Sequence, residues 1–143
     1  MTEKSCGTIP YTLRDGVRHY LLIKNRRDNA CGFPKGHVEA GESETETALR
    51  ETWEETSITP TIDPTFRYEM SYKLSNGNRK TVIYFLAKFE NQIPHRNQGF
   101  ENFDYLLLPF DEAYQALTFE NARKMLIAAR NFQESPHPLA NKS

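Results

Sequence analysis

The chain has 143 residues, of which 38% are hydrophobic, and a formal net charge of −1. This length fits one domain with a buried core, and the near-zero charge argues against a general nucleic-acid or membrane binder. Cys6 and Cys31 suggest neither a disulfide framework nor a metal site, and no signal region or membrane-length apolar run occurs, so we expect a cytoplasmic protein without membrane contact.

Two strands are predicted at the start of the chain. Cys6 to Leu13 alternates apolar and small or polar residues, and Arg18 to Lys24 contains an apolar run typical of a buried strand. Asp15-Gly16 between them is a hairpin-turn signal. Asn25 to Gly32 is short and polar, which predicts a loop leading into the next segment.

Residues Phe33 to Ile58 carry most of the functional information. Through Glu42 they predict a tight loop, and from Ser43 onward they predict one helix. Ser43 followed by Glu46 is a capping-box pattern, which satisfies backbone donors at a helix start. Thr56, Ser57 and Thr59-Pro60 end the predicted helix.

Three carboxylates share one face of this predicted helix. Glu51, Glu54 and Glu55 have the spacing i, i+3, i+4, at which like charges repel by a few tenths of a kcal/mol. A divalent cation among them would remove this cost, and oxygen ligands select magnesium, calcium or manganese over zinc. The opposite face, which we expect to pack on the core, carries Leu49, Trp53 and Thr56.

The helix taken alone favours a solvated acidic surface, and the preceding loop changes the balance between the two interpretations. Gly36 and Gly41 permit close backbone approach, and Lys35 is a mobile cation suited to phosphate. Glycines and a cation directly before a carboxylate-rich helix predict a site for a metal ion and a polyphosphate.

A second hairpin follows the helix. Phe66 to Leu74 and Lys80 to Phe89 read as strands on either side of the turn signal Ser75-Asn76-Gly77-Asn78. Asn91 to Asn102 predicts a loop, and the residues after it predict a strand over Phe103–Leu108 and helices over Asp111–Leu117 and Phe119–Phe132. We expect one domain over residues 1–134 and a disordered tail over residues 135–143.

The segment from Gly36 to Ile58 resembles the Nudix box, G-x5-E-x7-R-E-U-x-E-E-x-G-U, where U is an aliphatic residue. The matching positions are Gly36, Glu42, Arg50, Glu51, Glu54, Glu55 and Ile58. Thr52 stands at the first aliphatic position, and Ser57 stands at the glycine, at a cost of about 1 kcal/mol if that position is left-handed. With the order of predicted elements, the resemblance implies an α/β fold, the Nudix-type α/β/α sandwich with a mixed sheet.

Within that superfamily, the chain is similar to the asymmetrically cleaving diadenosine tetraphosphate hydrolases through residues 34–42, 47–52 and 80–85. This resemblance implies metal-dependent hydrolysis of a phosphoanhydride bond, giving ATP and AMP, with Mg²⁺ or Mn²⁺ as the cofactor. The histidine run that the family usually has before the proline is absent, because Asn29-Ala30-Cys31-Gly32-Phe33 stands there. Substrate length and base preference therefore stay open.

The resemblance also implies roles for individual residues. The implied metal ligands are Gly36, Glu51, Glu54 and Glu55. The implied catalytic residues are Glu54 or Glu55 as the proton acceptor, Arg50 as the residue that orients the carboxylates, and Glu101 in a loop facing the helix. The implied substrate-binding residues are Lys35 and Lys80 toward the phosphates, Tyr72 and Phe119 stacked on bases, and Tyr84. Ordinary packing is an equal alternative for Tyr72 and Phe119, and a solvated strand end is the alternative for Lys80.

Three functions remain open from the sequence. The first is a dinucleoside polyphosphate hydrolase, and the second is a Nudix enzyme acting on RNA 5′ ends or nucleoside triphosphates. The third is a binding module that does not cleave its nucleotide, against which the intact set of Glu51, Glu54 and Glu55 argues. The expected partner is a small nucleotide. The sequence does not predict the exact substrate, the general base, the number of metal ions or the oligomeric state.

Overall fold

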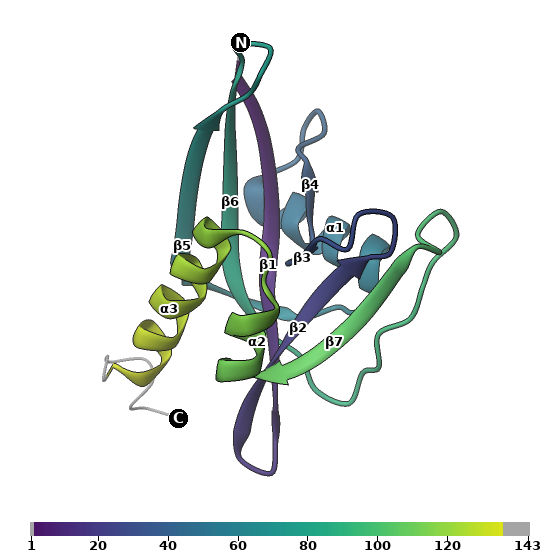
Figure 1. Ribbon diagram of the computed structural model, residues 1–143, viewed down its shortest axis with the longest axis vertical. Helices are drawn as coiled ribbons and strands as arrows, with labels where there is room; N and C mark the ends of the chain where they lie inside the picture. The colour runs from purple at the N-terminus through teal and green to yellow at the C-terminus, as the bar shows by residue number, and fades with distance from the viewer. Residues whose placement is uncertain (1, 136–143) are drawn as a thin grey trace.

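A mixed β-sheet organises residues 2–135, the part of the chain that the computed structural model describes (Figure 1). Its two central strands are β1 (Thr2–Arg14) and β6 (Arg79–Lys88), which run parallel from the Thr2–Arg79 pair to the Tyr11–Lys88 pair. On the other side of β6, β5 (Thr61–Lys73) pairs antiparallel with it, as the hairpin signal predicted.

The rest of the sheet is built on β1 and β2. Strand β2 (Val17–Asn25) pairs antiparallel with β1 and also with β7 (Phe103–Pro109). Two short strands, β3 (Cys31–Gly32) and β4 (Lys35–His37), pair with β2 and β1 respectively. Both lie in stretches that the sequence predicted as loops, because strands of two and three residues have no periodicity to detect.

Helices cover both faces of the sheet, which confirms the predicted α/β/α sandwich. Helix α1 (Glu44–Thr56) lies behind the sheet in Figure 1, whereas α2 (Phe110–Ala116) and α3 (Glu120–Glu134) lie in front of it. Side chains of β6 alternate between the two layers. Ile83 packs with Ala48 of α1, and Val82 belongs to the cluster that includes Met125 of α3.

The ends of α1 follow the sequence closely. Ser43 is the N-cap, and its hydroxyl accepts a hydrogen bond from Glu46 N at 3.1 Å while Glu46 Oε1 accepts one from Ser43 N at 2.8 Å. At the other end, Ser57 adopts the left-handed conformation, with φ of 63°. The capping box is therefore confirmed, and the helix stops where a glycine is the usual residue.

One prediction about α1 is wrong. Trp53 was expected in the core, but its side chain is 51% exposed. The buried face of α1 consists of Thr47, Ala48, Thr52 and Thr56, so Thr56 is the one residue of the predicted core face that is fully buried, and Leu49 is half-buried. Thr52 Oγ1 lies 2.7 Å from Thr8 Oγ1 of β1, and it also donates to Ala48 O at 2.7 Å. This face is small and hydroxyl-bearing, so a search for apolar periodicity favoured the tryptophan instead.

Two smaller predictions concern the C-terminal part of the chain. The first C-terminal helix is expected to begin at Asp111, but α2 begins at Phe110 and its N-cap is Pro109, with no side-chain cap. The predicted tail, apart from Ser135, lies outside the described residues. Among residues 2–135, no helix combines the length and apolar character needed to cross a membrane.

Candidate active site

Arg50 is the central residue of the acidic face of α1. Its guanidinium lies 2.6 Å from Glu42 Oε2, 2.7 Å from Glu51 Oε2 and 3.2 Å from Glu54 Oε1. It also donates to His37 O at 2.9 Å. The hydrogen bond to Glu42, followed by the bonds to the other carboxylates, raises the pKa of Arg50, and Arg50 in turn lowers the pKa of Glu42 to about 2.

Glu51 packs directly against the backbone of β4. A Cβ atom added to Gly36 would lie 2.0 Å from both Cδ and Oε1 of Glu51. The side chain of Glu51 is only 13% exposed, so its carboxylate is held between Gly36 and Arg50. A glycine at position 36 is therefore what allows the carboxylate to reach this place.

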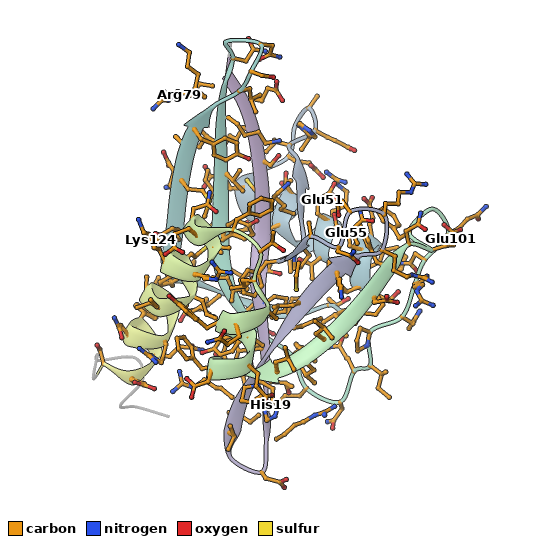
Figure 2. The ribbon with its side chains drawn as sticks, in the orientation of Figure 1. His19, Glu51, Glu55, Arg79, Glu101 and Lys124 are labelled. Carbon is orange, nitrogen blue, oxygen red and sulfur yellow. The ribbon has the colours of Figure 1, made fainter. Side chains whose placement is uncertain are left out.

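Glu55 is the third carboxylate of this face, and it is half-buried. Burial, and then the charge of the adjacent Glu51, raises the pKa of Glu55 to about 9, and the charge of Lys35 acts in the opposite direction. Figure 2 shows Glu51 and Glu55 together on α1. A carboxyl group with this pKa holds its proton at neutral pH, and a cation bound beside it would favour the ionised form that can accept a proton.

The donor atoms of this region suit a hard divalent cation. Among residues 2–135, no three His, Cys, Asp or Glu side chains converge closely enough to enclose a metal ion. Arg50 instead bridges Glu51 and Glu54. The donors are nevertheless all carboxylate or backbone oxygens, and Gly36 leaves room for Glu51 beside its backbone. This chemistry fits Mg²⁺ or Mn²⁺ and excludes a soft-metal site.

A pocket with a volume of about 640 Å³ opens beside the end of α1. Four of the predicted substrate-binding residues line it, together with Glu55: Lys35, Tyr72, Tyr84 and Phe119. Tyr84 is almost fully buried, and its pKa is raised by burial and then by Glu55 and Tyr72. It thus connects the carboxylate end of the pocket with the aromatic end.

Two further predicted site residues lie neither in this pocket nor on the acidic face of α1. Lys80 is buried on β6 directly opposite Tyr72, so it is not a solvated strand end. Burial, and then the positive charge of Lys35, lowers the pKa of Lys80. Glu101 lies on the loop before β7, away from Glu51 and Glu55 in Figure 2. Its carboxylate accepts a hydrogen bond from Gly99 N at 3.1 Å, which lowers its pKa.

The structure also identifies positions that sequence reasoning missed. A Cβ added to Gly7 would lie 2.1 Å from Pro34 O, so this glycine lets the segment before β4 cross β1. Asn97 donates through Nδ2 to Trp53 O at 2.8 Å and Glu54 O at 3.0 Å, and thereby caps the C-terminal end of α1. A glycine inside a strand pattern is a signal for close approach, whereas nothing near Asn97 in the sequence points to α1.

Comparisons with known proteins agree with this geometry. The NUDIX domain profile matches residues 8–129. The chain is 40% identical over 142 residues to the asymmetrical bis(5′-nucleosyl)-tetraphosphatase of Sus scrofa, which covers 92% of this chain and 96% of that protein. It is 37% identical over 70 residues to the RNA pyrophosphohydrolase of Roseobacter denitrificans, covering 43% of this chain and 44% of that protein.

A solved structure of similar shape is the binary complex of a Caenorhabditis elegans Ap4A hydrolase. The TM-score is 0.82 at 27% sequence identity, and the match covers 91% of this chain and 96% of that one.

Proposed function

Because the chain belongs to the NUDIX family of hydrolases, we propose that it cleaves a phosphoanhydride bond in a dinucleoside polyphosphate. Diadenosine tetraphosphate is the substrate we favour, with ATP and AMP as the products. The proposed catalytic unit is a single domain over residues 1–134. A cytoplasmic setting agrees with the two buried, free thiols of Cys6 and Cys31.

One observation carries this proposal: a single pocket has an aromatic end and a carboxylate end. Tyr72 and Phe119 are 39% and 58% exposed, as expected of aromatic side chains that stack on a ligand when it binds. Lys35 and Glu55 line the same cavity. A nucleoside stacked at the aromatic end would direct its phosphates toward α1, where the carboxylates lie.

The acidic face supplies the groups for hydrolysis. A bound Mg²⁺ or Mn²⁺, held by Glu51, Glu54, Glu55 and the carbonyl of Gly36, would supply Lewis-acid stabilisation of phosphoryl charge and a water of lowered pKa. Glu55 accepts the proton of the attacking water, because it is the half-buried carboxylate that also lines the pocket.

The basic residues have separate roles around these carboxylates. Arg50 holds Glu51 and Glu54 through its guanidinium and thereby sets their orientation. Lys35 neutralises phosphate charge inside the pocket. Lys80 lies two strands away, where it still senses the charge of Lys35, and it neutralises phosphates that extend outside the pocket. Glu101 stays a candidate catalytic residue whose loop would have to approach α1.

A hydrolysis screen with product identification tests the proposal. The purified chain is incubated with diadenosine tetraphosphate, ATP, GTP and a 5′-triphosphorylated RNA, each with an excess of EDTA or with an excess of Mg²⁺ or Mn²⁺. We expect ATP and AMP from the dinucleotide, only with the metal. Preferred cleavage of the RNA would favour the RNA 5′-end enzyme, and tight binding without cleavage would favour a nucleotide sensor.

A further inference from the structure

The pocket has few side chains that can recognise the edge of a base. Lys35 and Glu55 belong to its carboxylate end, where we place the phosphates, and most of the remaining lining is apolar or aromatic. Two carboxamides line it as well, Asn25 and Asn121. Asn25 Oδ1 already accepts a hydrogen bond from Arg27 N at 2.9 Å. Within residues 2–135, the carboxamide of Asn121 forms no hydrogen bond, so both its donor and its acceptor are available.

Asn121 sits on a well-fixed part of the pocket wall. It is the second residue of α3, and Phe119, one of the aromatic residues that line the pocket, is the N-cap of that helix. The preceding Thr118 is tied to β3 twice. Its Oγ1 accepts from Cys31 N at 2.7 Å, and its N donates to Cys31 O at 3.1 Å. This anchored turn fixes the backbone next to Asn121, and the exposed carboxamide is free to turn toward a base stacked on Phe119.

The chemistry of a carboxamide favours one purine over the other. An asparagine offers a donor and an acceptor side by side, which matches N7 and the N6 amino group of adenine. Guanine presents two acceptors, O6 and N7, on the same edge and leaves the amide oxygen without a partner. We propose that Asn121 is a specificity-determining residue that reads this edge of a base stacked on Tyr72 or Phe119, and that it selects adenine over guanine.

This inference rests on the proposed function, and base preference is the quantity that tests it. Steady-state kinetics are measured on diadenosine and diguanosine tetraphosphate for the parent, Asn121→Leu and Asn121→Lys. We expect Asn121→Leu to raise KM for the adenine substrate about tenfold, with little change in kcat, since a bidentate contact typically discriminates by about this factor. Asn121→Lys replaces the acceptor with donors, which suit O6 and N7 of guanine, and should invert the preference.

Lys124→Ala is the matched control, because Lys124 is exposed on the same helix and does not line the pocket. It should leave the ratio of kcat/KM for the two substrates unchanged, whatever it does to overall affinity. If Asn121→Leu and Asn121→Lys also keep the parent ratio of kcat/KM, Asn121 does not read the base. Thermal midpoints measured on the same preparations establish that each variant is folded.

A different result would separate this inference from the proposed function. If the parent cleaves neither dinucleotide, the proposed function fails, and equilibrium binding of AMP and GMP to the same variants replaces the kinetics. A loss of AMP preference in Asn121→Leu would still sustain the role of Asn121. An unchanged AMP-to-GMP affinity ratio would overturn it.

Discussion

The carboxylate of Glu51 occupies the space that any side chain at position 36 would need, because a Cβ on Gly36 would lie 2.0 Å from its Cδ and Oε1. The φ angle of Gly36 lies outside the left-handed region. The glycine is therefore required by the approach of β4 to α1, and its conformational freedom is not the reason for it.

Gly36→Ala should lower activity strongly while leaving the fold intact. The added methyl meets the end of a flexible side chain, so Glu51 can move aside at a cost of about 1 kcal/mol or less in stability. A displaced carboxylate of this kind typically costs about 100-fold in rate. The measurement is kcat/KM together with the thermal midpoint.

Gly7→Ala provides the contrast. Its methyl would meet the backbone, at 2.1 Å from Pro34 O and 2.9 Å from Lys35 Cα, and a backbone cannot move aside as a side chain does. We expect a loss of about 1–3 kcal/mol in the free energy of unfolding. If both alanine variants lose the same stability, the distinction between the two glycines is wrong.

Glu55→Gln should fold normally and be nearly inactive. The change is close to isosteric, and it removes a half-buried carboxylate that lies beside Glu51, so the thermal midpoint should stay the same or rise. Turnover should fall by about 10²–10⁴-fold, the usual contribution of a general base. Glu112→Gln, an exposed change on α2, is the control for both readouts. Turnover within a few-fold of the parent at saturating magnesium would mean that the acidic face is only a surface.

Tyr72→Ala should raise KM for a dinucleoside substrate more than it lowers kcat. Stacking of a base on an aromatic ring is worth about 1–3 kcal/mol and acts equally on the ground and transition states. Leu13→Ala, another exposed apolar side chain but at the distant β1–β2 hairpin, should change neither constant. An unchanged KM in a folded Tyr72 variant would remove this residue from the site.

Glu44 should make stability depend on acid pH. Arg67 binds its carboxylate with two hydrogen bonds, at 2.8 and 2.9 Å, and Lys4 lies 2.7 Å away. Arg67, helped by Lys4, lowers the pKa of Glu44 from 4.5 to about 2. The resulting stabilisation is complete above pH 4.5 and is lost as the pH falls through about 2.

Glu44→Gln should therefore be less stable than the parent by about 1 kcal/mol at pH 7, a figure reduced for solvent screening, and the gap should close between pH 4.5 and pH 2. Urea denaturation at several pH values measures it. Glu69→Gln removes a more exposed partner of the same Arg67 and should have a smaller effect. A gap that does not change with pH would exclude the ionised carboxylate as its cause.

Ser57 combines strain with a compensating hydrogen bond. Its φ of 63° costs a non-glycine residue about 1 kcal/mol, but its single hydroxyl proton is shared between His95 O at 3.1 Å and Asn97 Oδ1 at 3.0 Å. Ser57→Gly should stay within about 0.5 kcal/mol of the parent because relief and loss offset each other. Ser57→Ala keeps the strain and loses this hydrogen bond, so it should be less stable by about 1–2 kcal/mol. Chemical denaturation of both variants checks this order.

The local parts of this fold could be predicted from sequence. Ser43 and Glu46 satisfy each other within one helical turn, so their pattern alone located the start of α1. The Asn76-Gly77 turn located the β5–β6 hairpin in the same way. The grouping of Lys35, Tyr72, Tyr84 and Phe119 needed the family resemblance, since four separate segments contribute them to one pocket.

What the sequence missed depends on contacts between distant segments. Trp53 was placed in the core because the true core face of α1 carries threonines, and Thr52 finds its partner only in Thr8 of β1. Gly7 and Asn97 have roles defined by Pro34 and by the end of α1. Gly7 inside a strand pattern signals only that some backbone comes close, without saying which, and nothing near Asn97 in the sequence indicates its role.

The parallel pairing of β1 with β6 also bears on how the chain reaches its folded state. Strand β1, which begins at Thr2, cannot form its hydrogen bonds to β6 until residues Arg79 to Lys88 have been synthesised and have docked beside it. Closing so long a loop is entropically costly, and folding slows as contacts join more distant residues. Helix α1 is specified locally by its capping box, yet the sheet on which it rests forms late. We therefore expect the carboxylates of the site to reach their positions only in the final, rate-limiting assembly of the sheet.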